Sequence, residues 1–165
     1  MHSLSATVST HVNTDQAVAF ETIVPIDLTT IFQGYGPLPA VTSVEGQSGA
    51  WDTVGQTRVV LLSDQSSLTE TLTQYNYPNY FSYTLSDFTG SLRFLTSSAQ
   101  GEWWFSQREA SQTYIQWRYA FQARSILAIP LLWLLVNGLW CRYMHRTLQR
   151  AQTYIRPNEN VMGMR

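Results

Sequence analysis

The chain has 165 residues, of which 44% are hydrophobic and 13% are charged, and its formal net charge is -1. This length suffices for one globular core and is short for two, so we expect a single domain. Because the chain has no overall positive charge to hold a phosphate backbone, we expect no nucleic-acid partner. Residues 124–165 carry six arginines and one acid, whereas residues 1–123 carry four arginines and ten acids, so the C-terminal segment is the basic one.

Cysteine and histidine usage limits the chemistry that the sequence supports. Cys141 is the only cysteine, so no disulfide can form within the chain. His2 and His11 lie in the start of the chain, and His145 has no second ligand at metal spacing. P-loop, GxGxxG and GxSxG motifs do not occur, so we expect no metal and no cofactor. The start of the chain lacks the basic and apolar regions of a signal peptide, which favours a cytoplasmic protein.

The N-terminal quarter of the chain predicts short elements. Residues 1–14 are expected to be flexible, and the run QAVAFETIVP at 16–25 is typical of a strand. The apolar spacing at 25–36 predicts a short helix that ends near Gly34, and a short strand is expected at 41–47.

The middle of the chain alternates apolar and polar residues, which is typical of a half-buried antiparallel sheet. Residues 55–76 predict a hairpin whose turn lies at Ser63–Ser66. Three further strands are expected at 80–88, 101–109 and 112–123.

The segment SILAIPLLWLLVNGLW at 125–140 is the most apolar part of the chain. Seventeen residues separate Arg124 from Arg142, which gives a helix of about 25 Å, at the short limit of a membrane span. Pro130, Asn137 and Gly138 weaken a transmembrane interpretation. We therefore expect one long helix that lies across the sheet.

The continuation of this helix is amphipathic. Its apolar stripe comprises Cys141, Met144, Leu148, Ala151 and Ile155. At 100° per residue the stripe continues backward through Asn137 and Leu134, so both are expected to face the interior. The Asn137 amide would then either bond to a neighbouring backbone group or orient a ligand in an apolar pocket.

The opposite helix face is expected to combine leucines with arginines. Its members include Leu131, Leu135, Leu139, Arg142 and Arg146. An apolar patch beside a basic row can dock on a membrane surface, form a dimer contact or lie under a loop.

Glu70 lies on the same strand face as Leu68 and Leu72. There it could act as a general acid or base, bond a ligand headgroup, or pair with Arg58. The hairpin register decides between these roles: a two-residue turn places Glu70 opposite Val59, and a one-residue bulge brings Arg58 onto its face.

The order of elements and four segments resemble the SRPBCC superfamily, the START-like polyketide cyclase/dehydrase and lipid transport group. The segments are IVPIDLTTIF, GQTRVVLLSDQSSLTETL, GEWWFSQREASQTYIQWRYAFQAR and YMHRTLQRAQTYI. The resemblance covers residues 15–156, with a flexible tail expected at 157–165. It implies an α+β helix-grip fold, in which a curved antiparallel sheet of about seven strands wraps a long C-terminal helix and one or two short helices follow the first strand.

The resemblance also implies a cavity between sheet and helix for a small hydrophobic ligand. Candidate lining residues are Glu70, Phe81, Tyr83, Leu85, Trp103, Phe105, Ile115, Trp117, Tyr119, Leu134 and Asn137. Any of them could instead be ordinary core. A bacterial-type binding protein for a lipid, quinone-like or polyketide-like molecule is the first hypothesis. The alternatives are a cyclase/dehydratase-type enzyme with Glu70 and either Tyr83 or Tyr119 as its acid–base pair, and a membrane-surface or partner-docking protein, including a homodimer.

Overall fold

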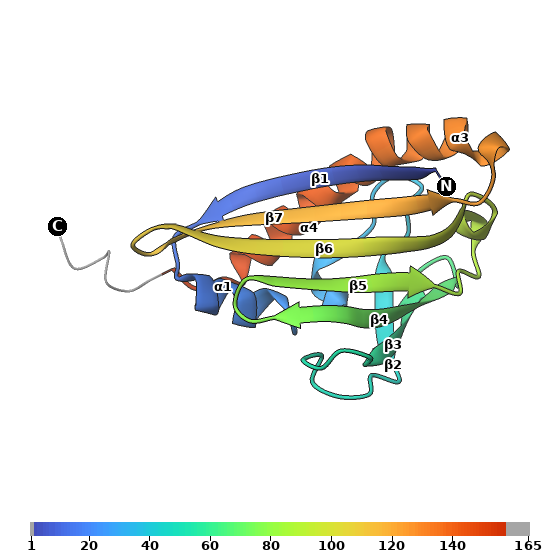
Figure 1. The fold of residues 1–165 in the computed structure, drawn as a ribbon. Helices are drawn as coiled ribbons and strands as arrows, with labels where there is room; N and C mark the ends of the chain where they lie inside the picture. Colours follow the sequence, from blue (N-terminus) through green and yellow to red (C-terminus); the bar gives the residue numbers. More distant parts are fainter. Residues whose placement is uncertain (1, 158–165) are drawn as a thin grey trace.

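The computed structural model describes residues 2–157, which form a seven-stranded antiparallel sheet, a long C-terminal helix and several shorter helices (Figure 1). The strands are β1 (Ser3–Val12), β2 (Val41–Glu45), β3 (Thr57–Leu62), β4 (Ser67–Asn76), β5 (Tyr80–Ser86), β6 (Thr96–Glu109) and β7 (Gln112–Ala123). The helical segments are α1 (Gln16–Ile23), α2 (Leu28–Ile31), η1 (Ser91–Phe94), η2 (Ile126–Ala128), α3 (Ile129–Leu134), η3 (Leu135–Trp140) and α4 (Cys141–Thr153).

The strands lie in the order β1-β7-β6-β5-β4-β3-β2. Figure 1 shows the helix that starts after β7 running along the sheet towards α1, and its α4 segment contacts β1 and α2. Alternate residues of β7, such as Ile115, Trp117 and Tyr119, are buried, as a sheet with one covered face requires. This arrangement is the helix-grip fold, so the expected α+β class is confirmed.

Two predictions for the N-terminal part of the chain are wrong. Residues 3–12 are an ordered edge strand, β1, which pairs with β7 from Ser3–Gln122 to Val12–Thr113, and they are not a flexible start. The expected strand at 16–25 is the helix α1, whose buried residues Ala19, Phe20 and Ile23 follow helical spacing. A short apolar run does not distinguish the two periods, and here the helical one applies.

The remaining elements follow the predicted order. The short helix expected at 25–36 is the single turn α2, and β2 to β7 lie where strands were predicted, with β6 beginning earlier, at Thr96. Of the tail expected to be flexible, 157–165, all but Pro157 lies outside the described residues.

The turn between β3 and β4 fixes the register on which the role of Glu70 depends. Gln65 N–H donates to Leu62 O at 3.0 Å, and Leu62 N–H donates to Ser66 O at 2.9 Å. Gln65 has a φ of 67°, so the loop is a type I turn followed by a left-handed residue that forms a bulge. As a result Arg58, and not Val59, lies opposite Glu70.

The long helix contains a π-helical turn, η3, in which Cys141 N–H bonds to Val136 O, five residues back. In a regular α-helix Leu132 and Leu148 would lie about 160° apart around the axis. A π-bulge takes up one extra residue and removes about 100° of that difference. Leu132 and Leu148 are therefore both buried on the sheet side.

The predicted helix phase is consequently wrong before residue 141. Leu134 is 61% exposed, and Asn137 is exposed, its side-chain amide donating to Trp133 O at 3.0 Å. Asn137 therefore makes the backbone bond that was one of its two predicted roles. Leu135, which was expected to point outward, is half-buried.

Candidate ligand-binding site

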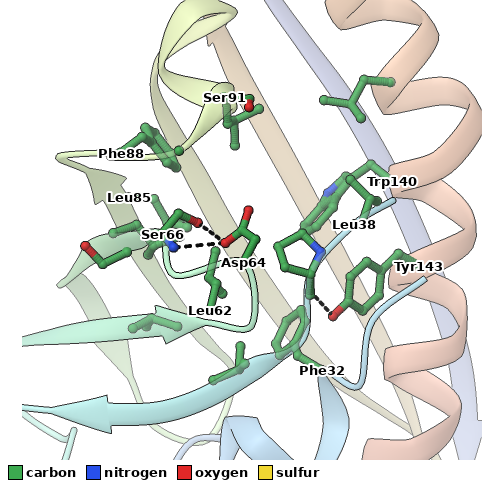
Figure 2. Close-up of a pocket in the computed structure, with 18 of the residues that line it drawn as sticks. Phe32, Leu38, Leu62, Asp64, Ser66, Leu85, Phe88, Ser91, Trp140 and Tyr143 are labelled. Carbon is green, nitrogen blue, oxygen red and sulfur yellow. Dashed lines mark hydrogen bonds between the residues drawn. The ribbon is translucent and has the colours of Figure 1, made fainter. Parts of the chain in front are cut away.

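A cavity of about 290 Å³ lies between the long helix and strands β2, β3, β4, β5 and β7 (Figure 2). Its walls are mostly leucine, phenylalanine, valine and proline side chains. Three lining residues are exposed: Pro37 and Asp64 lie on two different loops and Ser91 begins η1, so these segments form the mouth. At the mouth, the backbone N–H and hydroxyl of Ser66 both donate to Asp64 Oδ1 (Figure 2).

Trp140 and Tyr143 form much of the helix side of the cavity. The Tyr143 hydroxyl donates to Pro39 O at 2.8 Å and accepts from Gly34 N–H at 2.9 Å. These bonds hold the loop between α2 and β2 against the helix. Burial raises the pKa of Tyr143, which therefore keeps its proton and its donated bond at neutral pH.

The indole N–H of Trp140 is a polar group without a partner. Its ring packs edge-on against Tyr119 at 4.9 Å and Phe121 at 5.6 Å between centroids. Nε1 is buried and has no hydrogen-bond partner among the described residues. Figure 2 shows the ring reaching from the helix towards the strands across the cavity. A donor in this position can be satisfied by an acceptor on a ligand.

Glu70 on β4 lines the sheet side of the cavity and is ion-paired. Its Oε2 accepts from Arg58 Nε at 2.7 Å, and both side chains are only 7% exposed. The Arg58 guanidinium also stacks over the Trp51 ring, 4.0 Å from its centroid. The structural pairing with Arg58 is therefore confirmed.

The two candidate tyrosines lie in different surroundings. Tyr119 lines the cavity, whereas the Tyr83 ring lies against the backbone of Gly101 and its hydroxyl accepts from Trp103 Nε1 at 3.5 Å. Burial, then the charge of Glu70, raises the pKa of Tyr83. Burial, then the neighbouring Tyr83 and Glu70, raises the pKa of Tyr119. Both phenols are therefore protonated at neutral pH, and each has a proton that it can donate.

Comparison with protein families yields a match over residues 3–156 to the model described as polyketide cyclase / dehydrase and lipid transport. The chain belongs to this family. The family binds small hydrophobic ligands, and a cavity between sheet and helix is consistent with that property. A search of curated protein sequences found no match.

Solved structures similar to this polyketide cyclase/dehydrase and lipid transport family member share its fold. One is an uncharacterized protein from Bacillus thuringiensis, 16% identical, with a TM-score of 0.63 over 91% of this chain and 97% of that chain. A second is norcoclaurine synthase from Thalictrum flavum, solved with dopamine and hydroxybenzaldehyde, 8% identical, with a TM-score of 0.69 over 99% and 89%. A third is ginseng major latex-like protein 151 from Panax ginseng, 10% identical, with a TM-score of 0.69 over 94% and 99%.

Only part of the predicted lining reaches the cavity of this family member. Glu70, Leu85 and Tyr119 line it. Tyr83, Leu134 and Asn137 do not, and the same holds for the remaining five predicted residues: Phe81, Trp103, Phe105, Ile115 and Trp117.

These five residues form a solid core under α1. The Trp103 and Trp117 rings stack at 4.7 Å, and Phe20 of α1 packs edge-on against Phe105 at 5.2 Å and Phe81 at 5.9 Å. Helix α1 therefore fills the space over this end of the sheet. These five residues were predicted to line the cavity, and they pack as core instead because neighbouring aromatic rings and α1 fill the space against them.

The sequence interpretation assigned the helix side of the cavity to Leu134 and Asn137, and it missed the loop contributions. Phe32 and Leu38 come from the segment after α2, and Leu92 comes from η1. Trp140 and Tyr143 are spaced three residues apart, a signal of a shared helix face. The spacing alone did not place these residues in the cavity, because the π-helical turn changes which face of the helix they occupy.

Proposed function

We propose that this protein binds a small, mostly apolar molecule that carries a hydrogen-bond acceptor, and that it acts as a binding or carrier protein. The observation that carries this proposal is the indole N–H of Trp140, which has no partner among the described residues and belongs to a residue that lines a mostly apolar cavity. A buried donor without a partner costs about 1–3 kcal/mol. A carbonyl, ester or quinone-like oxygen placed against Nε1 accepts this hydrogen bond and offsets part of that cost.

The size and lining of the cavity agree with such a ligand. A volume of about 290 Å³ is at the lower end of small-molecule pockets, which span about 300–1,000 Å³. Aromatic walls such as Phe32, Phe121 and Trp140 favour a flat ring or a short acyl chain. A lipid-like, quinone-like or polyketide-like fragment of this size fits these requirements.

The geometry favours binding over acid–base catalysis. Glu70 is held by Arg58, so its carboxylate already has a charged partner. Tyr119 has a raised pKa, so it is a weak acid and does not form the phenolate that a base requires. Norcoclaurine synthase shares the fold at 8% identity, which carries no activity to this chain.

The test is native mass spectrometry of the protein purified without detergent, followed by denaturation and identification of any released molecule. A discrete adduct of small-molecule mass that contains a carbonyl or similar acceptor is the expected result. A protein that stays unliganded, and that also fails to bind acetophenone in calorimetry, would refute the proposal. Turnover of a bound molecule that Glu70→Gln abolishes would favour the enzyme instead.

A further inference from the structure

One end of the molecule exposes large apolar side chains. They belong to η1, η2 and α3: Phe94, Ile126, Leu127, Leu131, Trp133 and Leu134. Leu127 is 91% exposed, Ile126 72% and Phe94 65%. We call this set the apolar end patch. Isolated exposed leucines are ordinary, whereas a contiguous set of this kind marks an interaction site.

The fold brings these segments together. Arg124 N–H donates to Leu95 O at 2.9 Å, which ties the end of η1 to the residues just before η2. Helix α3 follows η2 directly, and Figure 1 shows it at the same end of the sheet as the chain that leaves β7. The stretch Ile126–Thr153 is long and apolar enough to cross a bilayer by length and composition, yet only 22% of its most apolar window is buried.

In the segments 90–95 and 124–134 the only charged residues are arginines, and these segments carry the apolar end patch. Arg93 and Arg124 are exposed beside it, and the Arg93 guanidinium lies 4.7 Å from the Phe94 ring centroid. The sequence has no aspartate or glutamate at 88–101 or 110–157. A second copy meeting this surface about a two-fold axis would bring Arg93 and Arg124 of one copy near the same arginines of the other. An anionic lipid surface complements both the apolar side chains and the guanidinium groups.

We propose that the apolar end patch docks the protein on an anionic lipid bilayer. Leucine and isoleucine enter the acyl boundary, Trp133 and Phe94 lie at the headgroup level, and the two arginines contact lipid phosphates. The surface differs from the predicted one, since it shares only Leu131 with it. Leu135 and Leu139 are half-buried, and Arg146 stacks over Tyr35 at 4.9 Å.

The apolar end patch adjoins the cavity. Ser91, Leu92 and Leu95 line the cavity from η1 and the residue after it, and Leu135, next to Leu134, lines it from the helix. Docking therefore brings η1, which carries Ser91 at the mouth of the cavity, to the lipid surface. The docking itself does not depend on which molecule fills the cavity, so it can fail or hold independently of the proposed function.

The test is co-sedimentation with vesicles of phosphatidylcholine alone or mixed with phosphatidylglycerol. The variants are Leu127→Ser/Leu131→Ser for the apolar contact and Arg93→Gln/Arg124→Gln for the charge. Val54→Ser is the matched control, because Val54 is 57% exposed on the loop between β2 and β3. Circular dichroism checks that each variant is folded.

We expect the wild type and Val54→Ser to bind the anionic vesicles equally. Leu127→Ser/Leu131→Ser is expected to bind at least roughly tenfold more weakly, because each leucine loses apolar burial. Arg93→Gln/Arg124→Gln should lose the preference for anionic lipid. Wild-type protein that ignores both vesicles, or leucine variants that bind as well as the wild type, would overturn the proposal. A dimer in light scattering that Leu127→Ser/Leu131→Ser dissociates, without vesicle binding, would assign the surface to a second copy.

Discussion

Replacing Trp140 by phenylalanine removes the indole N–H and keeps an aromatic ring, so it tests what the N–H contributes to ligand affinity. Nε1 is buried without a partner among the described residues, so a ligand acceptor contributes about 0.5–1.5 kcal/mol there. That energy corresponds to roughly twofold to tenfold in affinity. The smaller phenylalanine also loses packing against Tyr119, and this loss affects every ligand.

Two probes of equal heavy-atom count separate these effects. Acetophenone carries a carbonyl acceptor, and cumene is its hydrocarbon analogue. We expect Trp140→Phe to weaken the binding of both probes in isothermal titration calorimetry, and to weaken acetophenone binding by a further factor of roughly twofold to tenfold. Trp133→Phe is the matched control, because Trp133 is 55% exposed on the same helix. Equal losses for the two probes would show that Nε1 does not contact the ligand acceptor, and the argument from the unpaired donor would be refuted.

Three further predictions concern stability. Arg58→Met leaves Glu70 buried without its partner, so the free energy of unfolding measured in urea should fall by about 3–5 kcal/mol, and Arg58→Met/Glu70→Leu should largely recover it. An equal fall in the double variant would contradict this account. Burial raises the pKa of Tyr119, so the folded state binds more protons than the unfolded state above the ordinary tyrosine pKa of about 10, and stability should fall as pH rises past that value. In thermal unfolding, the stability of Tyr119→Phe should fall less steeply with rising pH than that of the wild type. An unchanged pH dependence would contradict the raised pKa of Tyr119. Gln65 has a φ of 67°, so Gln65→Gly should raise the free energy of unfolding measured in urea by about 1 kcal/mol. A destabilised variant would show that the left-handed backbone of Gln65 is not strained.

The sequence predicted the sheet well where alternation was regular. In β7, Ile115, Trp117, Tyr119 and Phe121 share the buried face, as the two-residue period required. It failed for β1, whose edge position is set by pairing with β7 across more than a hundred residues of sequence. Residues 3–12 do alternate, with Leu4, Ala6, Val8 and Val12 on one face, but the small polar residues between them gave the run the composition of a flexible start.

The candidate site was predictable only in part. Glu70 and Tyr119 were found because they lie on alternating strands whose faces can be read from the sequence. The hairpin alternatives could not be separated, since a left-handed Gln65 is uncommon for a residue other than glycine and carries no signature. Trp140 was missed because a π-helical turn is rare and interrupts the helical period on which the extrapolation relied.

The π-helical turn also explains how one apolar segment can serve two surfaces. Residues 125–140 are too apolar for a helix that only covers a sheet, and most of the exposed ones precede the turn, as Leu131 and Leu134 do. After the turn, the helix directs Trp140 and Tyr143 to the cavity and buries Met144 and Leu148. With a regular α-helix, Leu134 and Asn137 would share the buried face of α4, and an amide would replace apolar contacts there. The turn therefore permits an exposed apolar end patch and a cavity wall on the same helix, which is the arrangement that collecting an apolar molecule at a lipid surface requires.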